Sequence, residues 1–192
     1  MNSTILKSLK TLSLISAFSL AALGSAQAAE YTALDSDETQ ITFNYRQMNV
    51  KMNGNFSKIK ANELRFDPAQ PENAKVSLEV ELASINAGYP DANTELAKDE
   101  WLAAAQYPLA TFEAEKIEAL GDQQYQVTGK LNIKGQSETI SVPFTFSEDG
   151  DKGVFSGNFR FLRNDFNIGE GQWKKTNIVA DDIEIHFQIV AK

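Results

Sequence analysis

The sequence contains no cysteine and only one histidine among its 192 residues. The lack of cysteine excludes disulfides, a thiolate nucleophile and every cysteine-ligated metal site. A single histidine argues against a zinc cluster or a serine–histidine relay. Positive charge is also scarce: the formal net charge is −8, which argues against nucleic acid as a partner. We therefore expect neither a metal nor a cofactor.

Long hydrophobic runs are nearly absent as well. The longest, Leu12–Leu23, follows Lys7 and Lys10 and precedes the small-residue pattern Ala26-Gln27-Ala28. This order is typical of a secretory signal peptide. The run is too short for a membrane anchor, which needs roughly 18 to 20 apolar residues.

Cleavage after Ala28 divides the chain into a signal peptide, 1–28, and one folded domain, 29–192. The mature chain then has no integral membrane segment, and the leader offers no cysteine for a lipid anchor. We predict a periplasmic protein, with secretion beyond the periplasm as the alternative.

What the sequence has in abundance is alternation of apolar and polar residues. Val76, Leu78, Val80 and Leu82, for example, alternate with polar residues, as expected of a strand with one dry face. Short polar turns at 134–137 and 148–151 favour antiparallel neighbours. The pattern predicts one short first strand and eight long ones: 31–34, 41–48, 53–66, 76–82, 109–117, 125–133, 140–146, 155–163 and 183–189.

The economical all-β arrangement of these strands is a closed antiparallel eight-stranded barrel, because closure removes exposed edge strands. One helix, predicted over Asp91–Ala105, interrupts it. We interpret Trp101 as core at one end of the barrel, with a lid over a ligand as the alternative. An outer-membrane barrel with its apolar face outward is a further alternative. The helix and the non-aromatic terminus Ile189–Lys192 argue against it.

Four stretches carry a family likeness: NGNFSKIKANELRFDP, AQYPLATFEAEKI, VTGKLNIKGQSETISVPF and FLRNDFNIGEGQW. In order and spacing they resemble the YceI-like family of exported, lipocalin-like proteins, over about 34–189. The resemblance implies an elongated eight-stranded barrel that encloses polyisoprenoids, quinones or fatty amides. Many members carry His where this chain has Gln47, and Arg-Asp-x-His-Leu where it has Ala92–Leu96. At Asn167 a family glycine is replaced by a residue that tolerates a left-handed backbone.

The alternation also predicts which side chains face the interior. With Trp101 at one end, they form a ligand-binding wall with almost no hydrogen-bonding groups. The predicted lumen residues are Phe43, Tyr45, Val80, Leu82, Trp101, Phe112, Leu131, Phe144, Phe146, Phe159, Phe161 and Arg163. From periodicity alone, rings that fill the lumen and rings that line a tunnel explain this set equally, and the family likeness favours the tunnel.

Arg163 is the one charge that the alternation places on the dry face. We interpret it as paired with Asp165, two residues along the strand. The alternative is a cation at the lumen mouth that meets a phosphate or quinone oxygen of a ligand.

These residues favour a periplasmic lipid carrier without catalysis, whose partner is one long apolar lipid. A second hypothesis is a stress-response or interaction protein with a filled barrel. A weaker third is an enzyme that acts on a bound lipid through Arg163, Asp165 and Tyr45. The oligomeric state stays open between a monomer and a homodimer.

Overall fold

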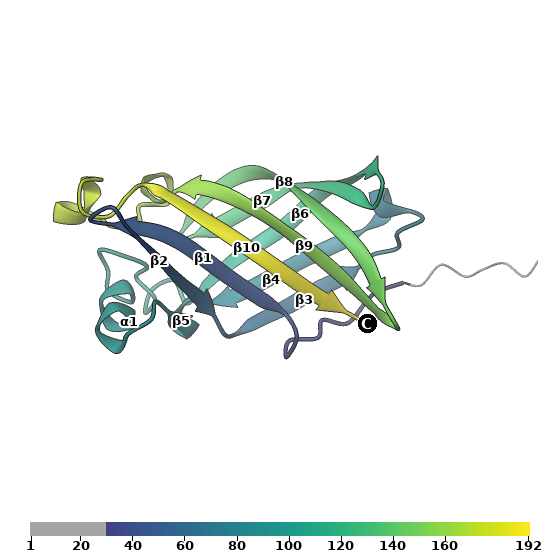
Figure 1. The fold of residues 1–192 in the computed structure, drawn as a ribbon, viewed down its shortest axis with the longest axis horizontal. Coiled ribbons are helices and arrows are strands. Elements are labelled where there is room, and N and C mark those ends of the chain that lie inside the picture. The colour runs from purple at the N-terminus through teal and green to yellow at the C-terminus, as the bar shows by residue number, and fades with distance from the viewer. Residues whose placement is uncertain (1–29) are drawn as a thin grey trace, which may run out of the picture.

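The computed structural model describes residues 30–192, so the predicted signal peptide lies outside the described residues. One curled sheet of ten strands runs along the length of the molecule (Figure 1). The strands are β1 Gln40–Gln47, β2 Val50–Phe56, β3 Ile59–Arg65, β4 Lys75–Glu81, β5 Ile85–Asn86, β6 Leu109–Gly121, β7 Gln124–Ile133, β8 Gln136–Asp149, β9 Lys152–Leu162 and β10 Asp182–Ala191. Their hydrogen-bonded order is β3-β4-β6-β7-β8-β9-β10-β1-β2-β5, and every pair is antiparallel.

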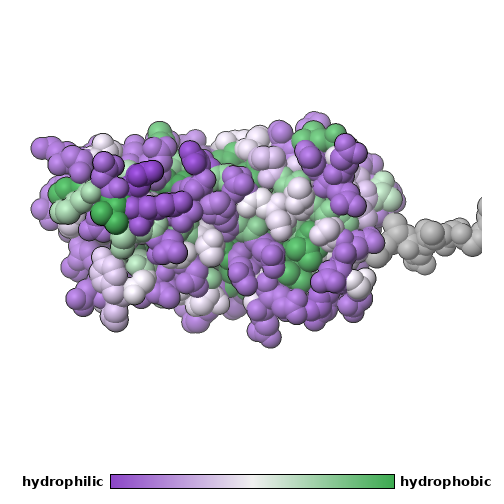
Figure 2. Space-filling model, viewed as in Figure 1, coloured by the Kyte–Doolittle hydropathy of each residue, from purple (hydrophilic) through white to green (hydrophobic). Residues whose placement is uncertain are grey.

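The predicted alternation holds along the strands, because successive side chains of a strand point to opposite faces. In β7, Tyr125, Val127 and Leu131 are buried whereas Lys130 and Asn132 are exposed. The histidine lies on the outer face of β10, where its side chain is 44% exposed. Figure 2 shows the outcome on one side of the molecule: hydrophilic side chains dominate and the apolar areas are small.

The all-β class with one short helix is confirmed, but the closed eight-stranded barrel is wrong. The sheet has ten strands, and its hydrogen-bonded order ends at β3 and β5 instead of closing. The expected strand 53–66 is two strands, because the chain turns a corner at Ser57 and Lys58. There the backbone N–H groups of both residues donate to the Ser84 hydroxyl at 3.2 and 3.1 Å. The expected first strand, 31–34, forms only two isolated bridges.

The helix is also shorter than predicted. α1 covers only Pro90–Leu96, and the chain then doubles back, with Leu102 N–H donating to the Leu96 carbonyl at 3.0 Å. The reversal buries Trp101 and Leu102, which a continuous helix would carry away from the sheet.

We call the end of the sheet beside α1 the mouth end. It also holds the 3-10 helices η3 Arg163–Phe166 and η4 Gly171–Lys174 (Figure 1). Two further 3-10 turns, η1 Pro71–Asn73 and η2 Leu82–Ser84, flank β4.

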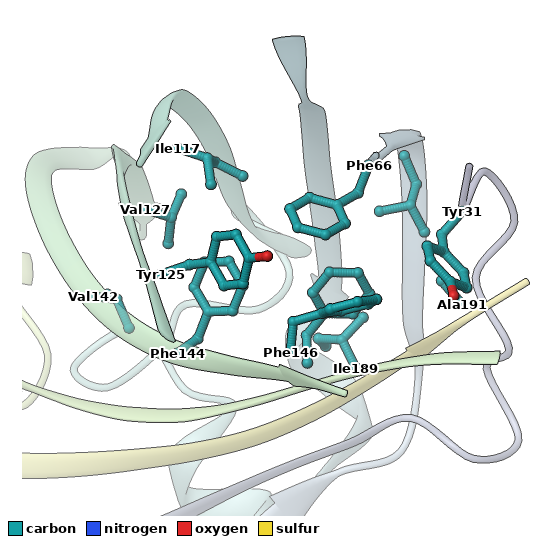
Figure 3. Packing of buried hydrophobic residues seen from close by; sticks show 12 residues of the cluster. Tyr31, Phe66, Ile117, Tyr125, Val127, Val142, Phe144, Phe146, Ile189 and Ala191 are labelled. Atoms are coloured by element: carbon teal, nitrogen blue, oxygen red, sulfur yellow. The ribbon is translucent and has the colours of Figure 1, made fainter. Parts of the chain in front are cut away.

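The opposite end, which we call the floor, is packed with aromatic rings (Figure 3). Phe66, 1% exposed, lies at the centre of the floor. Its ring centroid is 4.9 Å from that of Phe155 and 5.1 Å from that of Phe146, and Tyr31 meets Phe146 at 5.4 Å. Aromatic pairs at these distances stabilise a core beyond the area they bury. The floor therefore seals one end of the curled sheet.

Candidate functional site

The sheet encloses an interior cavity of about 450 Å³. A single water needs only roughly 10–15 Å³ on such a scale, so the cavity is far larger than a packing defect. Side chains from all ten strands line it, and nearly all are apolar. The inner row of β10, for instance, is Ile183, Ile185, Phe187 and Ile189. The dry faces of the described strands thus turn toward a hollow interior, and the outward orientation considered from sequence is wrong.

The structure brings most of the predicted lumen residues together around this cavity. Those that line it are Phe43, Tyr45, Val80, Leu82, Trp101, Phe112, Leu131, Phe144, Phe159, Phe161 and Arg163. That they contact a ligand stays a prediction.

Phe146 is the exception, because it is not among the residues that line the cavity. It lies in the floor, with its ring centroid 5.0 Å from that of Phe155 and 5.1 Å from that of Phe66. Alternation predicted correctly that Phe146 faces the interior. It could not predict that Phe66, which directly follows β3, packs against Phe146 and separates it from the cavity.

The few polar residues that line the cavity gather at the mouth end. Two of them, Tyr89 and Asp91 at the start of α1, are solvent-exposed. Phe66, which lines the opposite end, is 1% exposed. The cavity therefore meets solvent beside α1 and is closed at the floor. Near the mouth, burial raises the pKa of the Tyr45 hydroxyl, so this group stays a neutral donor.

Arg163 is completely buried at the mouth end, with 0% exposure. Its guanidinium donates to backbone carbonyl oxygens on both sides of the loop that follows β9. The shortest of these hydrogen bonds run from Nη1 to Ile168 (2.7 Å) and from Nη2 to Trp173 (2.7 Å) and Val179 (3.0 Å), while Nε reaches Ala180 (3.1 Å). Burial lowers the pKa of this guanidinium, partly offset by the Asp181 carboxylate, but an arginine stays protonated at such a site.

Both predicted roles of Arg163 are therefore corrected. Asp165 is exposed and forms no ion pair with Arg163 within residues 30–192. The chain leaves the strand at Arg163 and enters η3, so alternation no longer places residue 165 on the same side. The donors of Arg163 are already taken by carbonyl oxygens, which leaves none free for a headgroup.

Gly169 makes this arrangement possible. A Cβ atom there would lie 2.3 Å from Arg163 Nη1, and the backbone has a φ of +83°. Only glycine meets both conditions without strain. Two residues earlier, Asn167 takes the left-handed conformation, with φ 54°, so the turn persists there as predicted.

Trp101 covers the Arg163 guanidinium, whose Cζ atom lies 5.6 Å from the indole centroid. Trp101 also packs against Trp173, at 5.4 Å between ring centroids. Because Trp101 is 5% exposed and also lines the cavity, it belongs to the core at the mouth end, and its ring forms part of the cavity wall.

Sequence reasoning missed several lining residues, among them Phe66, Tyr89, Ile168, Trp173 and Val179. The last three come from the loop between β9 and β10, where no alternation exists to assign an inward face. Phe66 stands at the end of a predicted strand, and its alternation signal was available.

Two absences bear on chemistry. No cluster of three or more histidine, aspartate or glutamate side chains in the described residues could hold a metal ion. Over the same residues, 30–192, the structure has no helix with the length and apolar character of a membrane span.

Residues 32–191 match the YceI-like domain family. The chain belongs to this family. Among curated relatives, the UPF0312 protein of Pseudomonas savastanoi pv. phaseolicola is 29% identical over 134 residues, which are 66% of this chain and 68% of the relative. The UPF0312 protein of Azotobacter vinelandii is 26% identical over 171 residues, 84% of this chain and 87% of the relative.

Solved structures of three other proteins share the fold. Burkholderia cenocepacia BcnA is 38% identical, with a TM-score of 0.80 over 83% of this chain and 99% of BcnA. The Campylobacter jejuni YCEI protein is 27% identical, with a TM-score of 0.64 over 72% of this chain and 84% of its own. A polyisoprenoid binding domain from Saccharophagus degradans has a TM-score of 0.66 over 86% of this chain and 99% of its own. At 13% identity it is evidence of the fold alone.

Proposed function

We propose that this YceI-like protein encloses one long apolar lipid in its cavity and carries it through the periplasm without chemical change. The observation that carries the proposal is the cavity itself: about 450 Å³, lined by apolar side chains from every strand, with its exposed lining residues Tyr89 and Asp91 at the start of α1. Apolar cavities of this kind attract apolar ligands in preference to water. The closed floor limits the ligand to one that enters tail first.

The wall determines what such a ligand can be. Each buried methylene contributes about 0.8 kcal/mol, so a tail of about 20 carbons gains about 16 kcal/mol before ordering costs are subtracted. A wall with almost no hydrogen-bonding groups recognises mainly length and shape, and one methylene more or less changes affinity little. Polyisoprenoids, quinones and fatty-acid derivatives all fit this description.

The comparisons agree with a binding role. The Saccharophagus degradans protein that shares the fold is a polyisoprenoid binding domain. Because a shared fold alone does not transfer a ligand, this likeness does not identify the lipid. The periplasmic location rests on the predicted leader, 1–28.

The other two hypotheses find less support in the site. A filled barrel disagrees with a cavity of about 450 Å³. The three residues named for catalysis do not meet: Tyr45 lines the cavity, Arg163 is engaged by carbonyl oxygens and Asp165 is exposed. A binding protein is therefore our conclusion.

The test is organic extraction of the full chain, exported and purified without detergent, followed by mass spectrometry and by displacement of a hydrophobic fluorescent probe. We expect one lipid per protein and displacement by prenyl or acyl chains. Val80→Phe fills the cavity wall and should weaken probe binding by at least about tenfold. Thr139→Phe adds the same ring at an exposed position of β8 and should change nothing. No extracted lipid together with no probe binding would contradict the proposal.

A further inference from the structure

The hairpin between β1 and β2 turns at the mouth end (Figure 1) and carries exposed apolar side chains. Met48 and Val50 are the two most exposed large hydrophobic residues within 30–192, at 69% and 59%. Single apolar residues are ordinary on a protein surface, but these two belong to one turn. Gln47, which pairs with Val50 across the turn, also lines the cavity. The apolar turn therefore adjoins the rim of the cavity.

The backbone of this turn is unfavourable for a methionine. Met48 and Asn49 have φ angles of 48° and 67°, the pattern of a type I′ turn. Glycine, asparagine and aspartate adopt this left-handed conformation readily, whereas methionine does so at a cost. An exposed side chain gives the fold little packing in return. The side chain of Met48 is instead available to a surface outside the protein.

Cations flank the same turn. Arg46 and Lys51 lie directly opposite each other across the hairpin, and both are exposed. Like charges in this arrangement repel each other. Neither forms an ion pair with any of residues 30–192. The hairpin therefore keeps two opposed positive charges without a counter-charge.

The loop before β10 adds two more cations. Met48 N–H donates to the Ile178 carbonyl at 2.7 Å, so this loop lies alongside the turn. Lys174 and Lys175 precede Ile178 by four and three residues and are at most about 14 Å from it. Both are exposed and form no ion pair in the described part of the chain. Only two other exposed cations of that part lack an ion pair, Lys60 and Lys75.

We propose, building on the lipid-carrier function, that the hairpin tip Arg46–Lys51, together with Lys174 and Lys175, docks the mouth end on a bilayer that contains anionic lipids. Such a bilayer presents phosphates at its surface and hydrocarbon just beneath them. Met48 and Val50 enter the apolar layer, and the four cations meet the phosphates. Docking thus removes the exposed apolar surface from water and supplies the missing counter-charges. An acidic protein surface would supply the charges alone.

The rest of the molecule restricts the docking to this tip. The net charge of the chain is −8, so an anionic bilayer repels its other faces. Across the mouth from the hairpin, α1 carries the carboxylates Asp91 and Glu95. The bilayer therefore contacts the hairpin side of the mouth, where a lipid can pass between the membrane and the cavity.

Co-sedimentation with vesicles tests the docking on the full chain, exported and purified without detergent. We expect the wild type to bind vesicles of phosphatidylcholine and phosphatidylglycerol, to bind phosphatidylcholine alone far less, and to dissociate as the salt concentration rises. Met48→Asn should bind the anionic vesicles about tenfold more weakly. Because asparagine tolerates the turn, this variant should be at least as stable as the wild type. Lys51→Gln should weaken vesicle binding about fivefold.

Matched controls make the same changes at the floor end. Leu120→Asn alters an apolar side chain that is 58% exposed, and Lys75→Gln alters an exposed cation without an ion pair. Both should bind the vesicles like the wild type. Losses as large in the controls as at the tip, or equal binding to the two kinds of vesicle, would overturn the docking.

The hydrophobic fluorescent probe separates this inference from the carrier function. In solution, all four variants should bind the probe as the wild type does, because none of the four positions lines the cavity. A wild type that binds the probe but not the anionic vesicles would overturn the docking alone. A wild type that binds no probe would contradict the carrier function itself.

Discussion

The two ends of the molecule are held together by different forces. At the floor, the ring centroids of Phe66, Phe146 and Phe155 lie within 4.9 to 5.1 Å of one another. The ring of Tyr31 lies 5.4 Å from that of Phe146 and 6.5 Å from that of Phe155. At the mouth, by contrast, a buried guanidinium gathers the backbone carbonyls of an irregular loop. The floor depends on close contact between apolar surfaces, whereas the mouth depends on satisfying polar groups.

The difference matters for function because only the mouth needs an opening. Rings that interlock fill space and leave none for a ligand. A loop held from within by one side chain keeps its shape without filling the cavity, so the hollow part begins where the rings end. Four tests can probe this division, in order of expected effect.

The largest effect is expected for Arg163→Ala. This substitution leaves several buried carbonyl groups without a hydrogen-bond donor, and each unpaired group costs about 1–3 kcal/mol. We expect a loss of at least about 4 kcal/mol of unfolding free energy, measured in urea by tryptophan fluorescence. Arg160→Ala is the control: Arg160 lies three residues earlier, on β9, is exposed and pairs with Glu184, so about 1 kcal/mol or less should be lost. Similar losses in both would mean that Arg163 does not hold the mouth.

Phe66→Ala should cost about 3–4 kcal/mol, as for other large-to-small changes in a packed core. Phe161→Ala removes the same ring from a half-buried position on the cavity wall. There the ring already lacks partners on one side, so about 1–2 kcal/mol should be lost. Urea unfolding of both variants measures the comparison, and a Phe161→Ala loss as large as that of Phe66→Ala would indicate a cavity no emptier than the floor.

Larger side chains provide the opposite test, because they add volume at the floor or in the cavity instead of removing it. Ala191→Leu adds volume at a floor position with 0% exposure and should destabilise by about 1–3 kcal/mol through overpacking. Val80→Phe adds volume where the cavity offers room and should leave the thermal midpoint nearly unchanged. If Val80→Phe proves the more destabilising of the two, the cavity is not hollow in solution.

The smallest effect concerns acid. Asp35 joins the N-terminal segment to the floor end, with its carboxylate 2.7 Å from Lys192 Nζ and 3.5 Å from Lys152 Nζ. The hydrogen bond from Lys192 holds the pKa of Asp35 below its ordinary 3.8. The folded state therefore binds this proton less tightly than the unfolded chain. The contribution of the pair is complete above about pH 4 and is lost as the pH falls through the lower folded value.

NMR should therefore show the amide signals of 31–39 shifting below pH 4 in the wild type, and much less in Asp35→Asn. At the mouth, the bonds of Arg163 run to carbonyl oxygens, and neither partner titrates in acid. An acid shift of 31–39 that persists in Asp35→Asn would show that Asp35 does not hold this segment.

Much of the fold was predictable, because each strand carries its own alternation. The inward rows of β4, β7 and β10 follow from it directly. The corner at Ser57 could not be predicted from alternation, since it depends on a hydrogen bond to Ser84, 27 residues away. The helix end was missed for a similar reason: burial of Trp101 against Trp173 and Arg163 reverses the chain after Leu96.

The candidate site divides in the same way. Lumen residues on strands were predicted, and Phe146 was misplaced only along the length of the sheet. The partners of Arg163 were wrong because they belong to Ile168, Trp173, Val179 and Ala180, in a loop without periodicity.

The sequence alone determined that this protein has a dry inner face and a polar outer one, because the two sides of a strand are set by residue order. Only the tertiary structure decided how much of the interior stays empty and which carbonyl oxygens accept hydrogen bonds from Arg163. Both depend on how aromatic rings and carbonyl groups from segments far apart in the sequence pack together, and local alternation does not encode that packing.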